Sequence, residues 1–131
     1  MNIYDPNNSD VIEWISSGSS IHQWPESDWD YYVCNGKNDL LILQMAEDAE
    51  CQHRAFFVHC LYHLVGDYYL WNPSNNELRQ RIEDLITKAD EGSSEEVRAW
   101  AREAKELFSS NQKFIKNYWI GHLFFDGDLP E

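Results

Sequence analysis

Two apolar stripes at helical spacing lie in the second half of the chain, and they constrain the fold more than any other feature of the sequence. An asparagine at 75 or 76 can cap the first helix, and Gly92 follows its end. The second helix begins at a capping-box spacing, Ser93 to Glu96. Because only a few residues separate the two, they are predicted to pack as an antiparallel helical hairpin. The apolar residues of the first stripe are Leu78, Ile82, Leu85, Ile86 and Ala89, and those of the second are Val97, Trp100, Ala101, Ala104, Leu107 and Phe108.

Three further segments favour helices. A long apolar run predicts a core helix over residues 49–65, and Gly66 is expected to end it. Near the N-terminus, a capping arrangement over 10–13 and a short apolar stripe predict a short helix. The last segment, from 111 to about 124, is apolar on most sides, which indicates that it is buried.

Residues 31–44 are open to two interpretations. The pair Asn35-Gly36 between two apolar runs favours a β-hairpin. Asp39, in contrast, can cap a helix, and the leucines and methionine after it favour a helix over 39–47. With the helix preferred, the prediction is an all-α fold of five or six helices packed as antiparallel pairs in a single helical domain, 1–131. The alternative is an α+β fold with a small hairpin at 31–44.

The length and composition are typical of one globular domain. The chain has 131 residues, of which 43 % are hydrophobic and 15 % aromatic, enough to form a core. No apolar run approaches the roughly 20 residues of a membrane span, and the N-terminal residues lack the basic and apolar regions of a signal peptide. A cytoplasmic location is therefore expected. The three cysteines are odd in number and fit no zinc spacing, so free thiols are expected.

The charge is strongly acidic and unevenly distributed. There are 23 acidic and 10 basic side chains, for a net charge of −13, and residues 1–36 and 117–131 contain no lysine or arginine. Binding to nucleic acid or to an anionic membrane needs clustered basic residues, so the sequence disfavours both. A basic protein is the natural partner, because opposite electrostatic fields steer two proteins together.

No motif for catalysis or for a cofactor is present. His59 and His63 lie at i, i+4, which on a helix places two imidazoles on one face, as metal sites require. However, Cys60 occupies the position of the glutamate in H-E-x-x-H, and neither a nucleophile elbow nor a glycine-rich phosphate loop occurs. We expect no catalytic residue, no metal and no cofactor.

The stretch WPESDWDYYV, residues 24–33, interleaves carboxylates with aromatic rings. Trp29 and Tyr32 can be interpreted as core residues, whereas the carboxylates should remain in water. Exposed rings among carboxylates are typical of a site that binds a lysine- or arginine-rich partner, and FFDGDLPE near the C-terminus repeats this chemistry. The predicted partner-binding residues are Trp24, Glu26, Asp28, Trp29, Asp30, Tyr31, Asp126 and Asp128.

The stretches DWDYYV at 28–33 and CQHRAFFVHCLYHLVGD at 51–67, in a small acidic helical chain, give it a resemblance to bacterial immunity proteins. These are the antidotes to the toxins of contact-dependent growth inhibition and other polymorphic toxin systems. The resemblance is one of class and carries over no residue role. It implies one-to-one binding of a cognate toxin, often a basic nuclease, with the active site or a nearby surface blocked.

Two other functions stay open on the sequence. An acidic nucleic-acid mimic carried by a phage, of the anti-restriction or anti-CRISPR kind, would have a similar charge. A metal-dependent hydrolase would use His59 and His63. Oligomeric state and the identity of the toxin do not follow from the sequence.

Overall fold

The computed structural model describes residues 1–109 and 113–124, and this part of the chain is all-α. It contains seven α-helices, a short 3₁₀-helix and no strand, so the all-α prediction is confirmed and the hairpin at 31–44 is not formed. The helices are α1 (Asn8–Ser16), α2 (Trp29–Val33), α3 (Asp39–Glu47), α4 (Arg54–Trp71), α5 (Asn76–Asp90), α6 (Glu95–Ser109) and α7 (Lys116–Ile120), followed by η1 (His122–Phe124).

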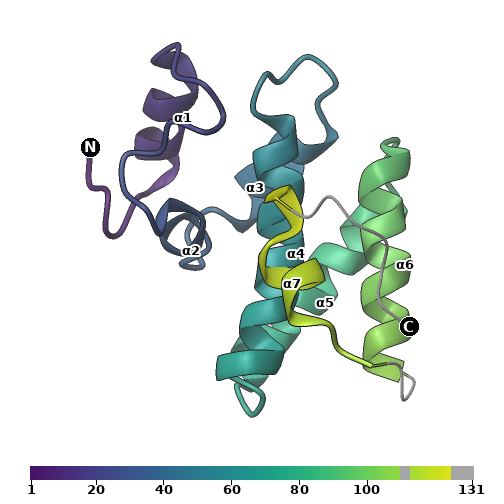
Figure 1. The fold of residues 1–131 in the computed structure, drawn as a ribbon. Helices are drawn as coiled ribbons and strands as arrows, with labels where there is room; N and C mark the ends of the chain where they lie inside the picture. Colours follow the sequence, from purple (N-terminus) through teal and green to yellow (C-terminus); the bar gives the residue numbers. More distant parts are fainter. Residues whose placement is uncertain (110–112, 125–131) are drawn as a thin grey trace.

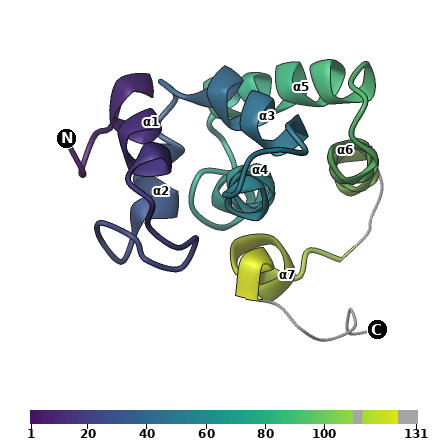
Figure 2. The ribbon, with the colours of Figure 1, turned by 90° about the horizontal axis from the view of Figure 1, so that it is seen from above.

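Helix α4 lies at the centre of the fold. It contacts α2, α3, α5, α6, α7 and η1, and Figures 1 and 2 show these elements arranged around it. Residues 56–66 are all buried, which explains why this run is apolar on every face. Because α4 makes most of the contacts between elements, its side chains determine where the other helices pack.

Helix α4 begins and ends later than predicted. It spans Arg54–Trp71 rather than 49–65, and Gly66 lies within it. A Cβ atom at Gly66 would lie 2.5 Å from Ile120 Cδ1, so the glycine serves the close approach of α7 to α4 and does not end the helix. Asp67 is consequently one turn after His63 on the same helix.

The two helices of the second half are confirmed, with one shift in the cap. The Asn75 side chain accepts a hydrogen bond from the N–H of Leu78 and caps α5. Ser94, rather than Ser93, precedes α6 and accepts from the N–H of Val97 at 3.3 Å. The two helices contact each other, although Figure 2 shows that their axes cross, with α6 seen end-on and α5 lying in the plane.

The first helix and the last segment differ in detail from the prediction. Helix α1 is capped by Asn7, whose side chain accepts from the N–H of Asp10 while the Asp10 carboxylate accepts from the N–H of Asn7. Asp10 is therefore the third residue of the helix and not its cap. In the last segment, the described residues form only the short α7 and η1, and α2 is a helix beyond the five or six that were predicted.

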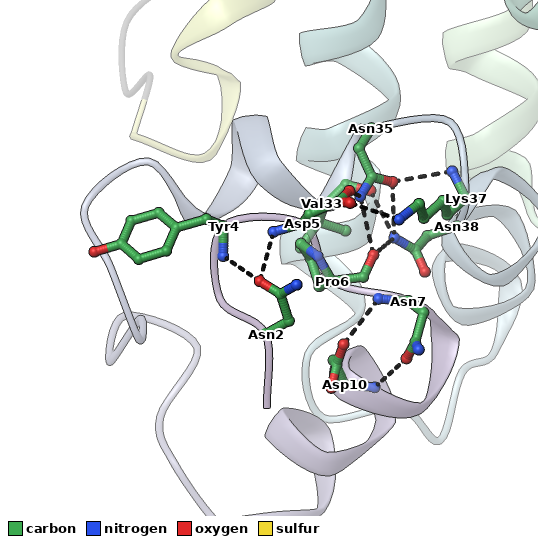
Figure 3. A network of polar contacts seen from close by, with 10 residues as sticks. All are labelled: Asn2, Tyr4, Asp5, Pro6, Asn7, Asp10, Val33, Asn35, Lys37 and Asn38. Carbon is green, nitrogen blue, oxygen red and sulfur yellow. Dashed lines mark hydrogen bonds and ion pairs between the residues drawn. The ribbon is translucent and has the colours of Figure 1, made fainter.

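The N-terminal segment is tied to the loop between α2 and α3 by amide side chains (Figure 3). Asn38 is fully buried, and its Nδ2 group donates to the carbonyls of Pro6 at 3.0 Å and Val33 at 3.1 Å. Asn35 donates to the same Pro6 carbonyl at 2.9 Å. The chain before α1 is thereby held beside the end of α2.

No helix among the described residues is both long enough and apolar enough to cross a membrane.

Candidate binding pocket beside α2

Helix α2 is anchored to the core by two side chains. Trp29 and Val33, one turn apart, are fully buried, and α2 packs on α4. Tyr31 lies away from their face and is exposed, whereas the Asp30 side chain turns toward His59 on α4 and is only partly exposed. The carboxylates and rings of this stretch therefore edge a pocket of about 550 Å³, here named the α2 pocket.

The α2 pocket is formed by residues that are distant in sequence. Trp24, Asp28, Asp30 and Tyr31 form one side. The opposite side consists of His59, His63 and Trp71, which follow one another at steps of four or eight residues on α4, and of Ile120 at the end of α7. The pocket thus combines two carboxylates, two imidazoles and three large aromatic side chains.

Asp30 is held by a buried histidine. His59 Nδ1 accepts a hydrogen bond from the backbone N–H of Leu123 at 3.1 Å, which assigns the ring proton of the neutral imidazole to Nε2. His59 Nε2 then donates to Asp30 Oδ2 at 2.8 Å. Burial alone would raise the pKa of Asp30, but the His59 hydrogen bond and the nearby charge of His63 outweigh it, and the pKa lies below its ordinary value. Asp30 is therefore a fixed negative charge in the pocket wall.

His63 is the second imidazole of the wall, and it is buried. Only 4 % of the residue is exposed, and its Nδ1 atom has no hydrogen-bond partner among the described residues. Burial lowers the pKa of His63, but the Cys34 thiol and the carboxylates of Asp30 and Asp67 act more strongly together, so the pKa is raised. The protonated form of His63 is therefore more favourable here than it is for a free imidazole.

Cys34 and His63 bring a thiol and an imidazole into contact, as a nucleophile and its base require. The Cys60 thiol and His63 lower the pKa of Cys34 against the effect of its burial. However, Cys34 is 8 % exposed, donates its S–H to the Cys60 carbonyl at 3.7 Å, and does not line the α2 pocket. A molecule in the α2 pocket would therefore not meet this thiol.

The histidines share a face of α4, as their spacing predicted, with ring centroids 5.9 Å apart. In the part of the chain that the structure describes, no group of three or more His, Cys, Asp or Glu side chains is placed to hold a metal ion. Both ring nitrogens of His59 already take part in hydrogen bonds with Asp30 and Leu123. The donor set of a metallohydrolase is therefore not assembled at these residues.

The structure brings together half of the predicted partner-binding residues. Trp24, Asp28, Asp30 and Tyr31 all line the α2 pocket. Glu26 does not line it; its carboxylate accepts from the backbone N–H of Asp28 at 2.7 Å and from the Ser27 hydroxyl at 3.0 Å. Those hydrogen bonds, with the Asp28 amide as the stronger cause, lower the pKa of Glu26.

Three other predicted residues do not belong to the described surface. Trp29 must be removed from the predicted set, because it is fully buried and packs edge-on against Trp14 in the core. This agrees with the alternative interpretation of Trp29 as a core residue. Asp126 and Asp128 lie outside the described residues.

The prediction missed the α4 side of the pocket. The spacing of His59, His63 and Trp71 could have indicated these lining residues, because the three positions lie toward one side of a continuous helix. Ending that helix at residue 65 removed Trp71 from it. No local pattern indicates that His59 meets Asp30, so neither histidine was predicted as part of this site.

The chain matches no family model, no curated protein and no solved structure.

Proposed function

We propose that this protein is an immunity-type inhibitor that binds and neutralises a cognate basic toxin, with a nuclease as the expected toxin activity. The observation that carries the proposal is the gathering of Trp24, Asp28, Asp30 and Tyr31 around one pocket. Trp71 joins them from α4, and Tyr31 and Trp71 are 51 % and 56 % exposed. Large rings that are open to solvent beside carboxylates are typical of protein-binding hot spots.

The charge of the whole chain supports a basic partner. The chain has a net charge of −13, and the residues up to 36, which include α2, contain acidic side chains but no lysine or arginine. A negative field raises the rate at which a positively charged protein meets it in the correct orientation. The partner's own basic residues would be those that otherwise bind phosphate.

The proposed mechanism is occlusion. Carboxylates of the inhibitor pair with the lysines and arginines of the toxin, and the rings of Tyr31 and Trp71 supply apolar contact area. The toxin's substrate-binding surface is then covered, and nucleic acid is excluded. No chemical step by the inhibitor is needed.

The test is affinity capture from the native host at about 150 mM and about 500 mM salt, followed by an activity assay of the purified partner. We expect one basic toxin to be retained at both salt concentrations and its activity to be lost on adding the chain. A toxin gene beside the inhibitor gene would support the immunity function. Neighbouring phage genes together with a captured restriction or CRISPR effector would reject it in favour of the acidic nucleic-acid mimic.

A charge-reversal variant tests whether the toxin binds at the α2 pocket. Asp28→Lys combined with Tyr31→Ala should release the toxin, because both side chains are exposed at the pocket. Asp30 is unsuited to reversal, because its carboxylate accepts a hydrogen bond from buried His59. Asp84→Lys on α5 is the matched control, since it lies outside the α2 pocket. Retention of the toxin by the pocket variant, or equal release by both variants, would reject the α2 surface.

A further inference from the structure

The α2 pocket contains acceptors for a cation that its own side chains do not use. Asp30 Oδ2 accepts from His59, and Oδ1 accepts from the backbone N–H of Tyr31 at 2.9 Å. A carboxylate has about four lone-pair sites, so Asp30 retains acceptor capacity. Asp28 precedes α2 as its N-cap residue, yet its side chain makes no capping hydrogen bond. Two carboxylates therefore face the pocket with acceptor sites remaining.

A second, independent feature of the wall is a buried histidine without a full set of partners. His63 is 4 % exposed and lines the pocket, and its Nδ1 atom has no hydrogen-bond partner in the described structure. The raised pKa of His63 favours the protonated ring, in which both nitrogens are donors, so this buried atom is a donor without an acceptor. The two carboxylates of Asp28 and Asp30 outnumber this one imidazolium, so the wall keeps a net negative charge that suits a cation.

The aromatic side chains of the α2 pocket favour a guanidinium group over an ammonium group. Trp24, Tyr31 and Trp71 come from three separate places in the chain and line the same pocket. A guanidinium group is planar and weakly hydrated, stacks on aromatic faces, and donates five N–H groups in a fork that fits a carboxylate. An ammonium group is compact and strongly hydrated, and it lacks that planar fork. The wall is therefore better suited to arginine than to lysine.

We propose that the α2 pocket binds the guanidinium group of a single arginine side chain of the partner, with Asp30 and Asp28 as acceptors and Tyr31 and Trp71 packed against it. The volume of about 550 Å³ lies within the usual range of sites for small ligands. The partner that carries this arginine rests on the proposed function. The recognition of a guanidinium group does not, and it can be measured without that partner.

The test is a titration of the full-length, ¹⁵N-labelled protein with N-acetyl-arginine amide, followed by NMR. The comparison probes are N-acetyl-lysine amide, which has charge without the fork, and N-acetyl-citrulline amide, which has nearly the same shape without charge. At matched ionic strength, we expect saturable shifts at the amides of Asp30 and Tyr31 and at the Trp71 indole, with a millimolar dissociation constant for the arginine probe. The lysine probe should bind more weakly, and the citrulline probe should produce no saturable shift.

Two variants locate the site. Asp30→Asn keeps the shape and an oxygen acceptor for His59 but removes the charge, so arginine-probe affinity should fall about tenfold. Tyr31→Ala removes a half-exposed ring and provides a second test that leaves the His59 contact in place. Asp84→Asn on α5 is the control and should leave the affinity unchanged. Shifts elsewhere on the protein, equal binding of arginine and lysine probes, or unchanged affinity in both pocket variants would overturn the proposal.

The two proposals fail in different ways. If a toxin is captured and inhibited but the arginine probe does not bind the pocket, the guanidinium assignment is rejected and the inhibitor function stands. If the probe binds as expected but no toxin is captured, the pocket chemistry is supported and the inhibitor function is rejected.

Discussion

At the scale of single residues, a buried amide holds the N-terminal segment in place. Asn38 Nδ2 donates to Pro6 and Val33 carbonyls and to Asn35 Oδ1 at 3.2 Å. Asn38→Ala removes these three hydrogen bonds from a buried site and leaves a void there, and we expect the free energy of unfolding to fall by about 2–3 kcal/mol, measured by urea denaturation.

Lys37→Ala is the matched control for Asn38→Ala. Lys37 pairs with Asp5 at 2.6 Å in the same network, but both side chains are about half exposed. Exposed ion pairs contribute little, so the change in unfolding free energy should be much smaller than that of Asn38→Ala. Equal effects of the two substitutions would show that Asn38 has no special structural role.

His63 makes stability depend on pH in a defined direction. Its pKa is raised above the ordinary value of 6.5, so the protonated form is favoured in the folded protein. The stabilising contribution is fully present below pH 6.5 and is lost as pH rises through the folded-state pKa. The difference in unfolding free energy between the wild type and His63→Gln should therefore shrink as pH rises across this window.

Removing one of the charged groups around His63 tests whether those groups raise its pKa. It is influenced by Cys34 at the end of α2, by Asp30 on α2 and by Asp67 on α4. In Asp30→Asn, the loss of one negative charge should lower the His63 pKa, read from the NMR titration of its imidazole. An unchanged His63 pKa in that variant would mean that Asp30 does not act on it.

At the scale of elements, Gly66 determines how closely α7 approaches α4. A Cβ at this position would lie 2.5 Å from Ile120 Cδ1 and 2.8 Å from Ile120 Cγ1. Gly66→Ala should destabilise the protein, because overpacking costs about 1–3 kcal/mol and the better helix propensity of alanine offsets only about 1 kcal/mol. Urea denaturation measures the net loss, and amide hydrogen exchange should show α7 less protected.

The Ile120→Ala background isolates this contact. Removing the Ile120 side chain beyond Cβ removes the clash, so Gly66→Ala should now stabilise α4 by about 0.5–1 kcal/mol. If Gly66→Ala has the same effect in both backgrounds, the contact between α4 and α7 does not explain the glycine.

At the scale of the whole molecule, the net charge of −13 should govern how fast a basic partner binds. We expect the association rate with the captured toxin to fall at least about tenfold from low to high salt, measured by stopped-flow fluorescence. The dissociation rate should change much less. A salt-independent association rate would contradict electrostatic steering.

Asp28→Lys should lower this rate more than Asp84→Lys does. The two variants change the net charge equally, but only Asp28 lies at the α2 pocket. Equal reductions would attribute the effect to total charge and not to the surface beside α2.

The sequence by itself determined the elements whose signals are local. Helix α5 follows from an apolar stripe and from the Asn75 cap, which acts on Leu78 three residues later. Helix α3 was predicted over 39–47 and forms over Asp39–Glu47. Periodicity and capping depend on neighbours within one helical turn, so they can be detected without knowledge of the fold.

Only the tertiary structure decided which of the candidate residues meet. The hydrogen bond from His59 to Asp30 joins positions 29 residues apart, and Trp29 enters the core because α2 packs on α4. The reason for a glycine at position 66 is likewise a contact with Ile120, far along the chain. Such contacts depend on how the helices pack, and no pattern within a few residues specifies that packing. The sequence therefore indicated the acidic and aromatic side of the α2 pocket, whereas the fold supplied the histidines and Trp71 that complete it.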